Sequence, residues 1–132
     1  MIRPATPDDR PAIAAIQAAS PEASAWNPLE YICSVVESAG EVIAFLVTRE
    51  TTPGEREILN LAVHPAWRRN GIAKMLVQNA LTGSEANWYL EVRESNTAAI
   101  ALYTSLGFKL AGRREDYYND PSEAAIVMSF FS

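Results

Sequence analysis

The sequence has very little of what disulfide frameworks and zinc sites require, with one cysteine and one histidine in 132 residues. A lone cysteine excludes an intramolecular disulfide, and with a single histidine there is no Cys/His cluster of metal-ligand spacing. Cys33 lies in the apolar stretch LEYICSVVE, a setting typical of a buried structural thiol and not of a nucleophile. We therefore expect neither a metal centre nor cysteine-based catalysis.

Long apolar runs and an excess of positive charge are also missing. No run approaches the length of a membrane span, and the N-terminal MIRPATPDD has no apolar signal core, so we expect a cytoplasmic protein without membrane contact. The net charge of −5 would be repelled by phosphates, which argues against a nucleic-acid partner. The length predicts one domain over residues 1–132, and no surface pattern indicates an oligomer, so we expect a monomer.

What is present is an α/β pattern that begins with a strand and two helices. Residues 2–5 predict a short strand, and the next helix has Thr6 as its N-cap with Asp9 as the partner in a capping box. The stretch NPLEYICSVVESAG repeats these signals, so we expect a second helix that is capped by Asn27 and ends at Gly40.

Strands and helices alternate through the remaining residues. Strands are expected at EVIAFLVTRE and REILNLAVHP, joined by a turn at TTPGE, and at NWYLEV, FKLAGRRE and AAIVMSFF. Helices are expected at IAKMLVQNAL and NTAAIALYTSLG. The order βααββαβαββ predicts a mixed, mostly antiparallel sheet with helices on both faces.

A first candidate site is the turn in VHPAWRRNGIAKML, which follows a strand and opens a helix. The unpaired amides of a helix N-terminus can bind a pyrophosphate, and Gly71 permits close approach. Arg68 or Arg69 could add charge-assisted hydrogen bonds. An ordinary solvated turn with a basic edge explains the same residues. A dinucleotide fingerprint is excluded, because GxGxxG is absent.

A second candidate site combines a carboxylate in a strand with a phenol on a helix. Glu91, in the middle of NWYLEV, must face solvent, pair with a cation such as Arg93, or line a cleft as a general base. Asn96 can cap the next helix, and Tyr103 lies on the same face two turns later. Tyr103 is then either a packing residue or an acid that protonates a departing thiolate.

Three stretches together resemble the GNAT superfamily of acetyl-CoA-dependent N-acetyltransferases, and within it the bacterial ribosomal-protein alanine N-acetyltransferases. They are NLAVHPAWRRNGIAKML, YLEVRESNTAAIALYTSLGF and GRREDYY. The resemblance covers residues 41–128 and is looser before them. It implies acetyl-CoA as the acetyl donor, no metal, and as acceptor a protein N-terminus such as that of a ribosomal protein. A small amine, a lysine side chain or another peptide is the alternative acceptor, and a non-catalytic acetyl-CoA-binding module is the alternative of a different class.

The resemblance also implies roles for individual residues. Glu91 of LEVR would be the catalytic base and Tyr103 of ALY the catalytic acid. The coenzyme would be bound by Leu61, Ala62, Val63, Arg68, Arg69, Asn70, Gly71, Ile72, Ala73, Lys74 and Asn96. The acceptor would contact Tyr117, Tyr118, Arg113 and Arg114. His64, which adjoins the coenzyme strand, is expected to be structural.

Overall fold

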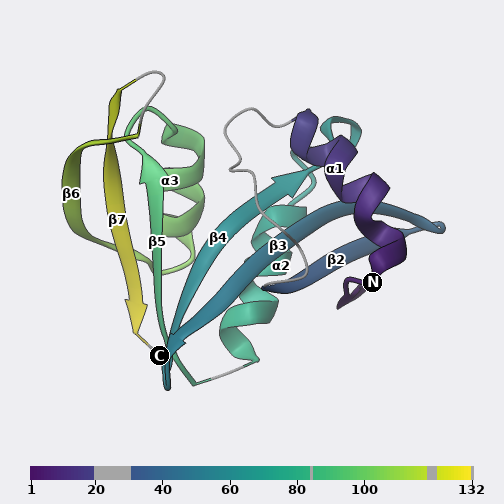
Figure 1. Cartoon of the computed structure of the whole chain (residues 1–132), viewed down its shortest axis with the longest axis horizontal. Helices are drawn as coiled ribbons and strands as arrows, with labels where there is room; N and C mark the ends of the chain where they lie inside the picture. Colours follow the sequence, from purple (N-terminus) through teal and green to yellow (C-terminus); the bar gives the residue numbers. More distant parts are fainter. Residues whose placement is uncertain (20–30, 84, 119–121, 132) are drawn as a thin grey trace.

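The computed structural model describes residues 1–19, 31–83, 85–118 and 122–131, which form one seven-stranded sheet and three α-helices (Figure 1). The strands are β1 (Ile2–Pro4), β2 (Ile32–Ser38), β3 (Glu41–Thr52), β4 (Glu55–Val63), β5 (Asn87–Arg93), β6 (Lys109–Tyr118) and β7 (Glu123–Phe131). The helices are α1 (Arg10–Ala18), α2 (Ile72–Thr82) and α3 (Thr97–Ser105), and 3-10 turns η1 (Pro7–Asp9) and η2 (Pro65–Trp67) come before α1 and α2.

The sheet has the strand order β1-β2-β3-β4-β5-β7-β6, and every neighbouring pair is antiparallel except β4 and β5. Helix α1 packs on one face of the sheet, while α2 and α3 contribute to the core on the other face (Figure 1). The predicted fold class, a mixed and mostly antiparallel sheet with helices on both faces, is therefore confirmed. Among the helices of the described ranges, none is long and apolar enough to span a membrane.

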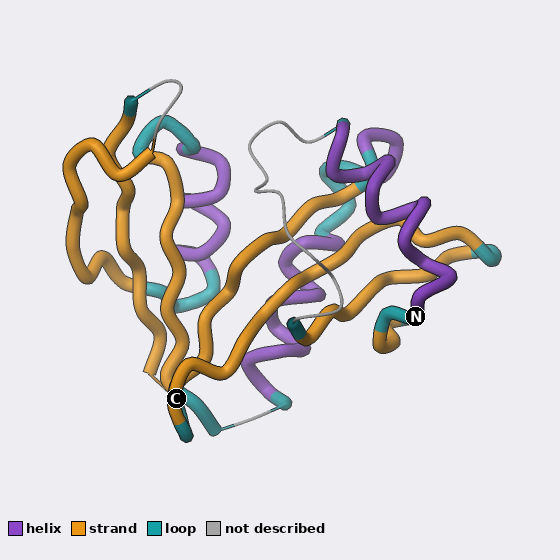
Figure 2. Tube along the Cα trace, viewed as in Figure 1, coloured by secondary structure: helices purple, strands orange, loops and turns teal. Residues whose placement is uncertain are grey.

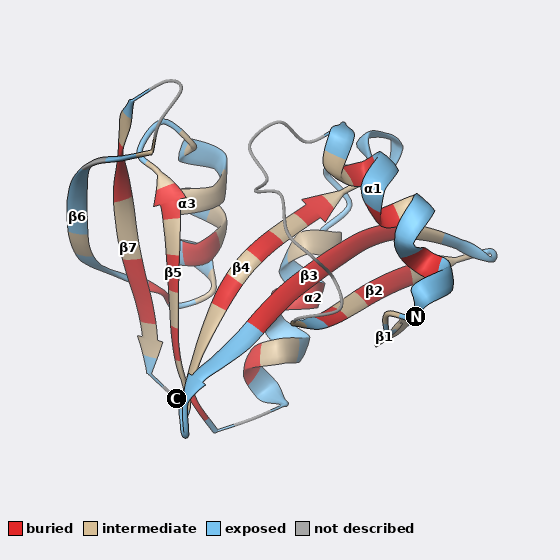
Figure 3. Ribbon diagram, viewed as in Figure 1, coloured by how far each residue is buried: buried red, intermediate tan, exposed pale blue. Residues whose placement is uncertain are grey.

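Burial is greatest along β3, which lies between β2 and β4 in the sheet (Figure 3). Ile13 and Ile16 of α1 pack with Phe45 on one side, and Leu76 of α2 packs with Leu46 on the other. Because both faces of β3 are covered, its sequence is a continuous apolar run and does not alternate.

The second predicted helix is wrong over residues 32–38, which form strand β2. Ile32 and Val36 have the spacing of a helix face, but Gly40 lies in a tight hairpin turn between β2 and β3 and does not end a helix. Ala39 and Gly40 have φ values of 51° and 81°, as the favoured two-residue turns between antiparallel strands require. Cys33 is buried in β2, and residues 27–30 of that prediction lie outside the described residues.

Candidate active site

The sheet opens between its two parallel strands. Residues 55–58 of β4 pair with residues 87–90 of β5, and beyond them the two strands diverge toward their C-terminal ends (Figure 2). The register between β3 and β4 shifts at the same place, because Thr48 pairs with Ile58 whereas Val47 pairs with Asn60. Leu59 is thus the extra residue of a β-bulge, and a bulge bends its strand. The bend turns β4 away from β5 and opens the sheet.

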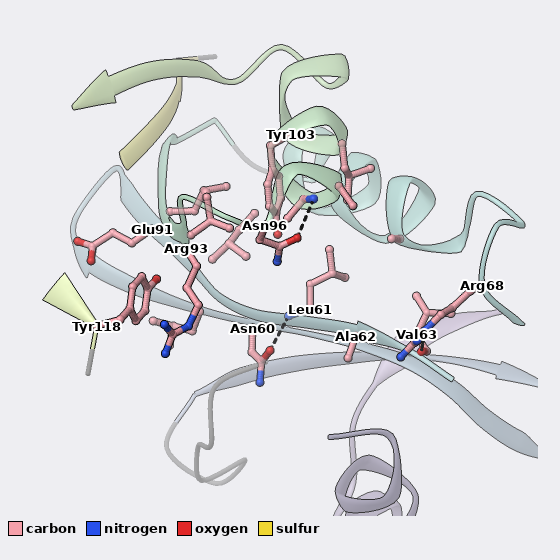
Figure 4. A pocket seen from close by; sticks show the side chains of 18 residues that line it. Asn60, Leu61, Ala62, Val63, Arg68, Glu91, Arg93, Asn96, Tyr103 and Tyr118 are labelled. Carbon is pink, nitrogen blue, oxygen red and sulfur yellow. Dashed lines mark hydrogen bonds between the residues drawn. The ribbon is translucent and has the colours of Figure 1, made fainter. Parts of the chain in front are cut away.

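A pocket of about 480 Å³ occupies this opening. Its walls are residues 58–63 of β4, residues 90–93 of β5 and one face of α3, with Tyr118 at one end and Arg68 at the other (Figure 4). Ala73 also lines the pocket. Of the predicted site residues, Leu61, Ala62, Val63, Arg68, Ala73, Glu91, Asn96, Tyr103 and Tyr118 line the pocket. The remaining ones, Arg69, Asn70, Gly71, Ile72, Lys74, Arg113, Arg114 and Tyr117, lie outside this lining.

Strand β4 presents backbone groups to the opening. The amide of His64 donates to the Ile43 carbonyl of β3 at 2.7 Å, and peptide groups alternate in direction along a strand. The amides and carbonyls of Leu61 and Val63 therefore point away from β3, into the space that β5 has left. An extended ligand with amide groups of its own could pair with them like an added strand.

The turn between η2 and α2 has the geometry of an anion site. Arg69 and Gly71 both have left-handed backbone conformations, with φ of 66° and 73°. No side chain caps the N-terminus of α2, and its first hydrogen bond runs from the Met75 amide to the Gly71 carbonyl at 3.0 Å. The side chain of Asn70 braces the turn by donating to the Trp67 carbonyl at 3.0 Å. The first amides of α2 are thus available to a phosphate.

Arg68 has a different place from the one expected for a phosphate ligand. Its Nε donates to the Val63 carbonyl at 3.2 Å, and its Nη2 donates to the Ala19 carbonyl at 3.0 Å. The guanidinium therefore ties the turn to β4 and to the end of α1. His64 is likewise engaged locally, because its Nδ1 accepts from the Ala66 amide at 3.0 Å and so caps η2.

Glu91 lies on the face of β5 opposite to its buried neighbours. Leu90 and Val92 belong to the same core as Tyr103, and the Glu91 side chain between them is 17% exposed. Its Oε1 lies 3.6 Å from Arg114 Nη2, while its buried Oε2 has no hydrogen-bond partner within the described part of the chain. Glu91 is thus a carboxylate at the pocket wall with one oxygen still able to accept a proton or a hydrogen bond.

Tyr103 approaches the pocket from α3, on the other face of the sheet. Its ring packs edge-on against Phe108 at a centroid distance of 5.4 Å, and burial raises the pKa of its phenol above the ordinary value. Asn96 caps α3, as predicted, because its side-chain oxygen accepts from the Ala99 amide at 3.2 Å. In Figure 4 the side chains of Glu91 and Tyr103 leave β5 and α3 in different directions. A carboxyl group and a phenol thus lie on opposite faces of the opening.

The tyrosines at the end of β6 form one wall near Glu91. Tyr117 and Tyr118 pack edge-on at 5.1 Å, and a hydrogen bond with Glu91 raises the pKa of Tyr117. Burial raises the pKa of Tyr118 to about 12, and the guanidinium of Arg93 lies 4.4 Å from the centre of its ring.

Arg114 stacks on Tyr117 at 5.4 Å. Arg113 is turned away from the pocket, since it binds Glu94 through two hydrogen bonds of 2.6 and 3.1 Å. Arg114 thus contacts both Tyr117 and Glu91.

Among the lining residues that sequence reasoning did not assign to the site, Asn60 is a polar one. It is a buried polar side chain in the apolar stretch ILNLAV, and it is 6% exposed. The same signal that singled out Glu91, a polar residue in a strand of apolar ones, was available for Asn60. Within the described ranges, no three His, Cys, Asp or Glu side chains lie close enough together to hold a metal ion.

Known proteins resemble this chain in sequence and structure. Residues 4–108 match the acetyltransferase (GNAT) family. The chain is 41% identical over 96 residues to the ribosomal protein bS18-alanine N-acetyltransferase of Escherichia coli K12, a match that spans 68% of this chain and 64% of that protein. It is 39% identical over 79 residues to the N-alpha-acetyltransferase RimI of Mycobacterium tuberculosis, across 59% of this chain and 50% of the relative.

The fold extends the similarity to almost the whole chain. The crystal structure of the ribosomal-protein-S18-alanine N-acetyltransferase from Escherichia coli matches with a TM-score of 0.84 at 33% identity, covering 98% of this chain and 92% of that one. The sequence match and the structural similarity agree with each other, and this chain belongs to the acetyltransferase (GNAT) family.

Proposed function

We propose that the protein transfers the acetyl group of acetyl-CoA to the N-terminal amine of another protein, with an N-terminal alanine of a ribosomal protein as the preferred acceptor. The observation that carries this proposal is the placement of Glu91 and Tyr103 on opposite faces of the opening between β4 and β5. Two substrates that approach from the two faces would meet there. The acceptor assignment is supported by the bS18-alanine N-acetyltransferases, which share 41% identity over 96 residues.

The residues along the opening fit the parts of acetyl-CoA in order. The amides at the N-terminus of α2, beyond Gly71, would bind the pyrophosphate, because unpaired helix amides and the helix dipole favour an anion. The backbone of Leu61 and Val63 would pair with the amides of the pantetheine arm. This pairing would bring the thioester to the part of the pocket between Glu91 and Tyr103.

The chemistry that follows transfers one acetyl group, removes two protons from the ammonium group and delivers one proton to the leaving thiolate. A protein α-amine has a pKa of about 7.7–8.0 and is largely protonated at neutral pH, so it must lose a proton before it can attack. Glu91 would accept this proton, directly or through water. The amine nitrogen would then bond to the acetyl carbon, and a backbone amide of β4 would stabilise the resulting oxyanion. As the C–S bond breaks, Tyr103 would give its proton to the leaving thiolate. The attacking nitrogen would lose its second proton to water, and the tyrosinate would regain a proton from solvent.

The acceptor would lie on the face of the sheet that carries Glu91. Tyr118 lines the pocket on this side, and Tyr117 packs edge-on against it just outside the lining, so the two phenols are candidate contacts for a peptide. The rim is mixed in charge, with Arg114 next to Glu91. Among the described residues that line the pocket, Glu91 is the only carboxylate, which supports its assignment as the base.

The assignment of the base can be tested by a single substitution with a matched control. Glu91→Gln keeps the size of the side chain but removes its basicity, and we expect kcat at neutral pH to fall by about 10²–10⁴, the usual contribution of a general base. The affinity for acetyl-CoA, measured by calorimetry, should change little. The control is Glu94→Gln. Glu94 directly follows β5 and pairs with Arg113 outside the pocket lining, so this variant should retain full activity. Equal losses of turnover and coenzyme affinity in Glu91→Gln would contradict a catalytic role.

A further inference from the structure

The side chain of Asn60 connects the pocket to helix α1. Its Nδ2 donates to Gln17 Oε1 at 2.7 Å. Its Oδ1 accepts from the Leu61 amide at 2.9 Å, as Figure 4 shows. Asn60 is 6% exposed, whereas Gln17 lies half-buried on α1. A buried amide is costly unless its hydrogen bonds are made, so this pair holds one specific arrangement of the strand.

The Leu61 amide, which donates to Asn60 Oδ1, is one of the backbone groups of β4 that face the opening. The hydrogen bond from His64 to Ile43 at 2.7 Å fixes the direction of the peptide groups, and it directs the Leu61 amide away from β3. The adjacent Leu59 is the bulge residue, where the strand bends and its ladder is interrupted. A peptide group next to a bulge has few backbone partners to fix its plane. The side chain of Asn60 supplies a partner at this point.

We infer that Asn60, braced by Gln17, is a positioning residue that orients the Leu61 amide toward the thioester carbonyl of acetyl-CoA. This inference rests on the proposed function, because it assigns the oxyanion-stabilising amide within that reaction. In the coenzyme-free protein, Asn60 Oδ1 is the acceptor of the Leu61 N–H. In the complex, the developing oxyanion is the stronger acceptor, and Asn60 keeps the peptide plane aligned through its bond to Gln17. Helix α1 is thereby coupled to the reaction centre.

Substitutions at the two residues separate this role from a merely structural one. Asn60→Leu removes both hydrogen bonds at similar volume. Loss of one aligned oxyanion donor costs about 10²–10³ in kcat, and we expect a fall of at least about tenfold, with KM for acetyl-CoA within about threefold of the wild-type value. Gln17→Met removes only the brace and should lower kcat less. Gln17→Glu restores an acceptor for Asn60 Nδ2 and should recover wild-type kcat.

A spectroscopic measurement tests the contact itself, independently of turnover. In a ¹⁵N–¹H spectrum of the free protein, the Leu61 amide proton should move upfield in Asn60→Leu, because it loses its acceptor, and less in Gln17→Met. The kinetic constants and melting temperatures of the same variants are then compared. A fall in kcat with unchanged KM for acetyl-CoA and an unchanged melting temperature supports the positioning role.

Three results would overturn it. The Leu61 resonance could stay in place in Asn60→Leu, kcat could be unaffected, or kcat, KM and melting temperature could deteriorate together, as expected for general loosening. Failure of the proposed function is recognised separately, because wild-type protein would then bind no acetyl-CoA or transfer no acetyl group to an alanine-starting peptide. That result would refute the positioning role as well.

Discussion

Replacement of Gly71 by alanine tests the phosphate-binding turn with a built-in control. Gly71 has φ of +73° and ψ of 13°, and an added Cβ would meet no atom within 4 Å. Gly54, in the turn between β3 and β4, has φ of +83° and equally open surroundings. The two alanine variants therefore suffer the same kind of backbone strain, but only one of them lies at the start of α2.

The expected loss of stability is similar for both variants. A non-glycine residue in the left-handed region costs roughly 1–2 kcal/mol. For a chain of 132 residues, an unfolding entropy of about 2.1 cal/mol/K per residue converts this cost into a fall in melting temperature of about 4–7 °C. Neither variant should unfold at 25 °C. The two variants should differ in their affinity for acetyl-CoA. In Gly71→Ala, the new methyl group or a relaxation of the turn disturbs the amides at the start of α2, whereas Gly54→Ala leaves these amides unchanged.

Isothermal titration calorimetry with acetyl-CoA measures this difference directly. We expect Gly71→Ala to bind at least about tenfold more weakly, the equivalent of losing part of one charge-assisted hydrogen bond, and Gly54→Ala to bind like wild type. S-acetyl-pantetheine, which lacks the pyrophosphate, should lose nothing in Gly71→Ala. Wild-type affinity of Gly71→Ala for acetyl-CoA, together with the expected loss of melting temperature, would refute the phosphate site at this turn.

Three further predictions concern single side chains. Tyr103→Phe should lower kcat by about 10²-fold without changing KM for acetyl-CoA. The control Tyr89→Phe, on β5 and outside the pocket lining, should leave both constants unchanged. Stopped assays with an alanine-starting peptide measure both constants. The hydrogen bond from Arg3 lowers the pKa of Asp9 from 3.8 to about 2. The ionised Asp9 therefore contributes on the order of 1–2 kcal/mol to the free energy of unfolding above pH 4, and this contribution is lost as the pH falls toward 2. Urea unfolding of wild type and Asp9→Asn should therefore differ at pH 6 and converge near pH 2, and a constant difference would contradict this. Burial raises the pKa of Cys33 to about 11, so at pH 8 a thiol reagent should modify it about 100-fold more slowly than in urea, and equal rates would show that the thiol is accessible.

The elements with strong local signals could be predicted from the sequence. The capping box before α1 is formed, with the Thr6 amide donating to Asp9 Oδ2 at 2.7 Å. The alternation of β5 places Glu91 opposite Leu90 and Val92, as expected. These features depend on residues within a few positions of one another, which is why the sequence reveals them.

Features that depend on distant partners could not be predicted. Strand β2 resembles a helix in isolation, and only its pairing with β3 and the left-handed turn at Gly40 make it a strand. The opening of the sheet follows from a register shift at Leu59, which no local pattern reveals. Asn60 stands out in the sequence as a polar residue among apolar ones, but its partner Gln17 lies 43 positions earlier in the chain, and no local pattern pairs the two.

The proposed acetyl transfer is tested most directly by intact-mass spectrometry of two peptides after incubation with the protein and acetyl-CoA. One peptide begins with alanine, as the N-terminus of a ribosomal protein would, and the other is an Nα-blocked copy that contains lysine. The account predicts a gain of one acetyl group on the free peptide and none on the blocked copy. Acetylation of the blocked copy, or of neither peptide, would contradict N-terminal acetyl transfer.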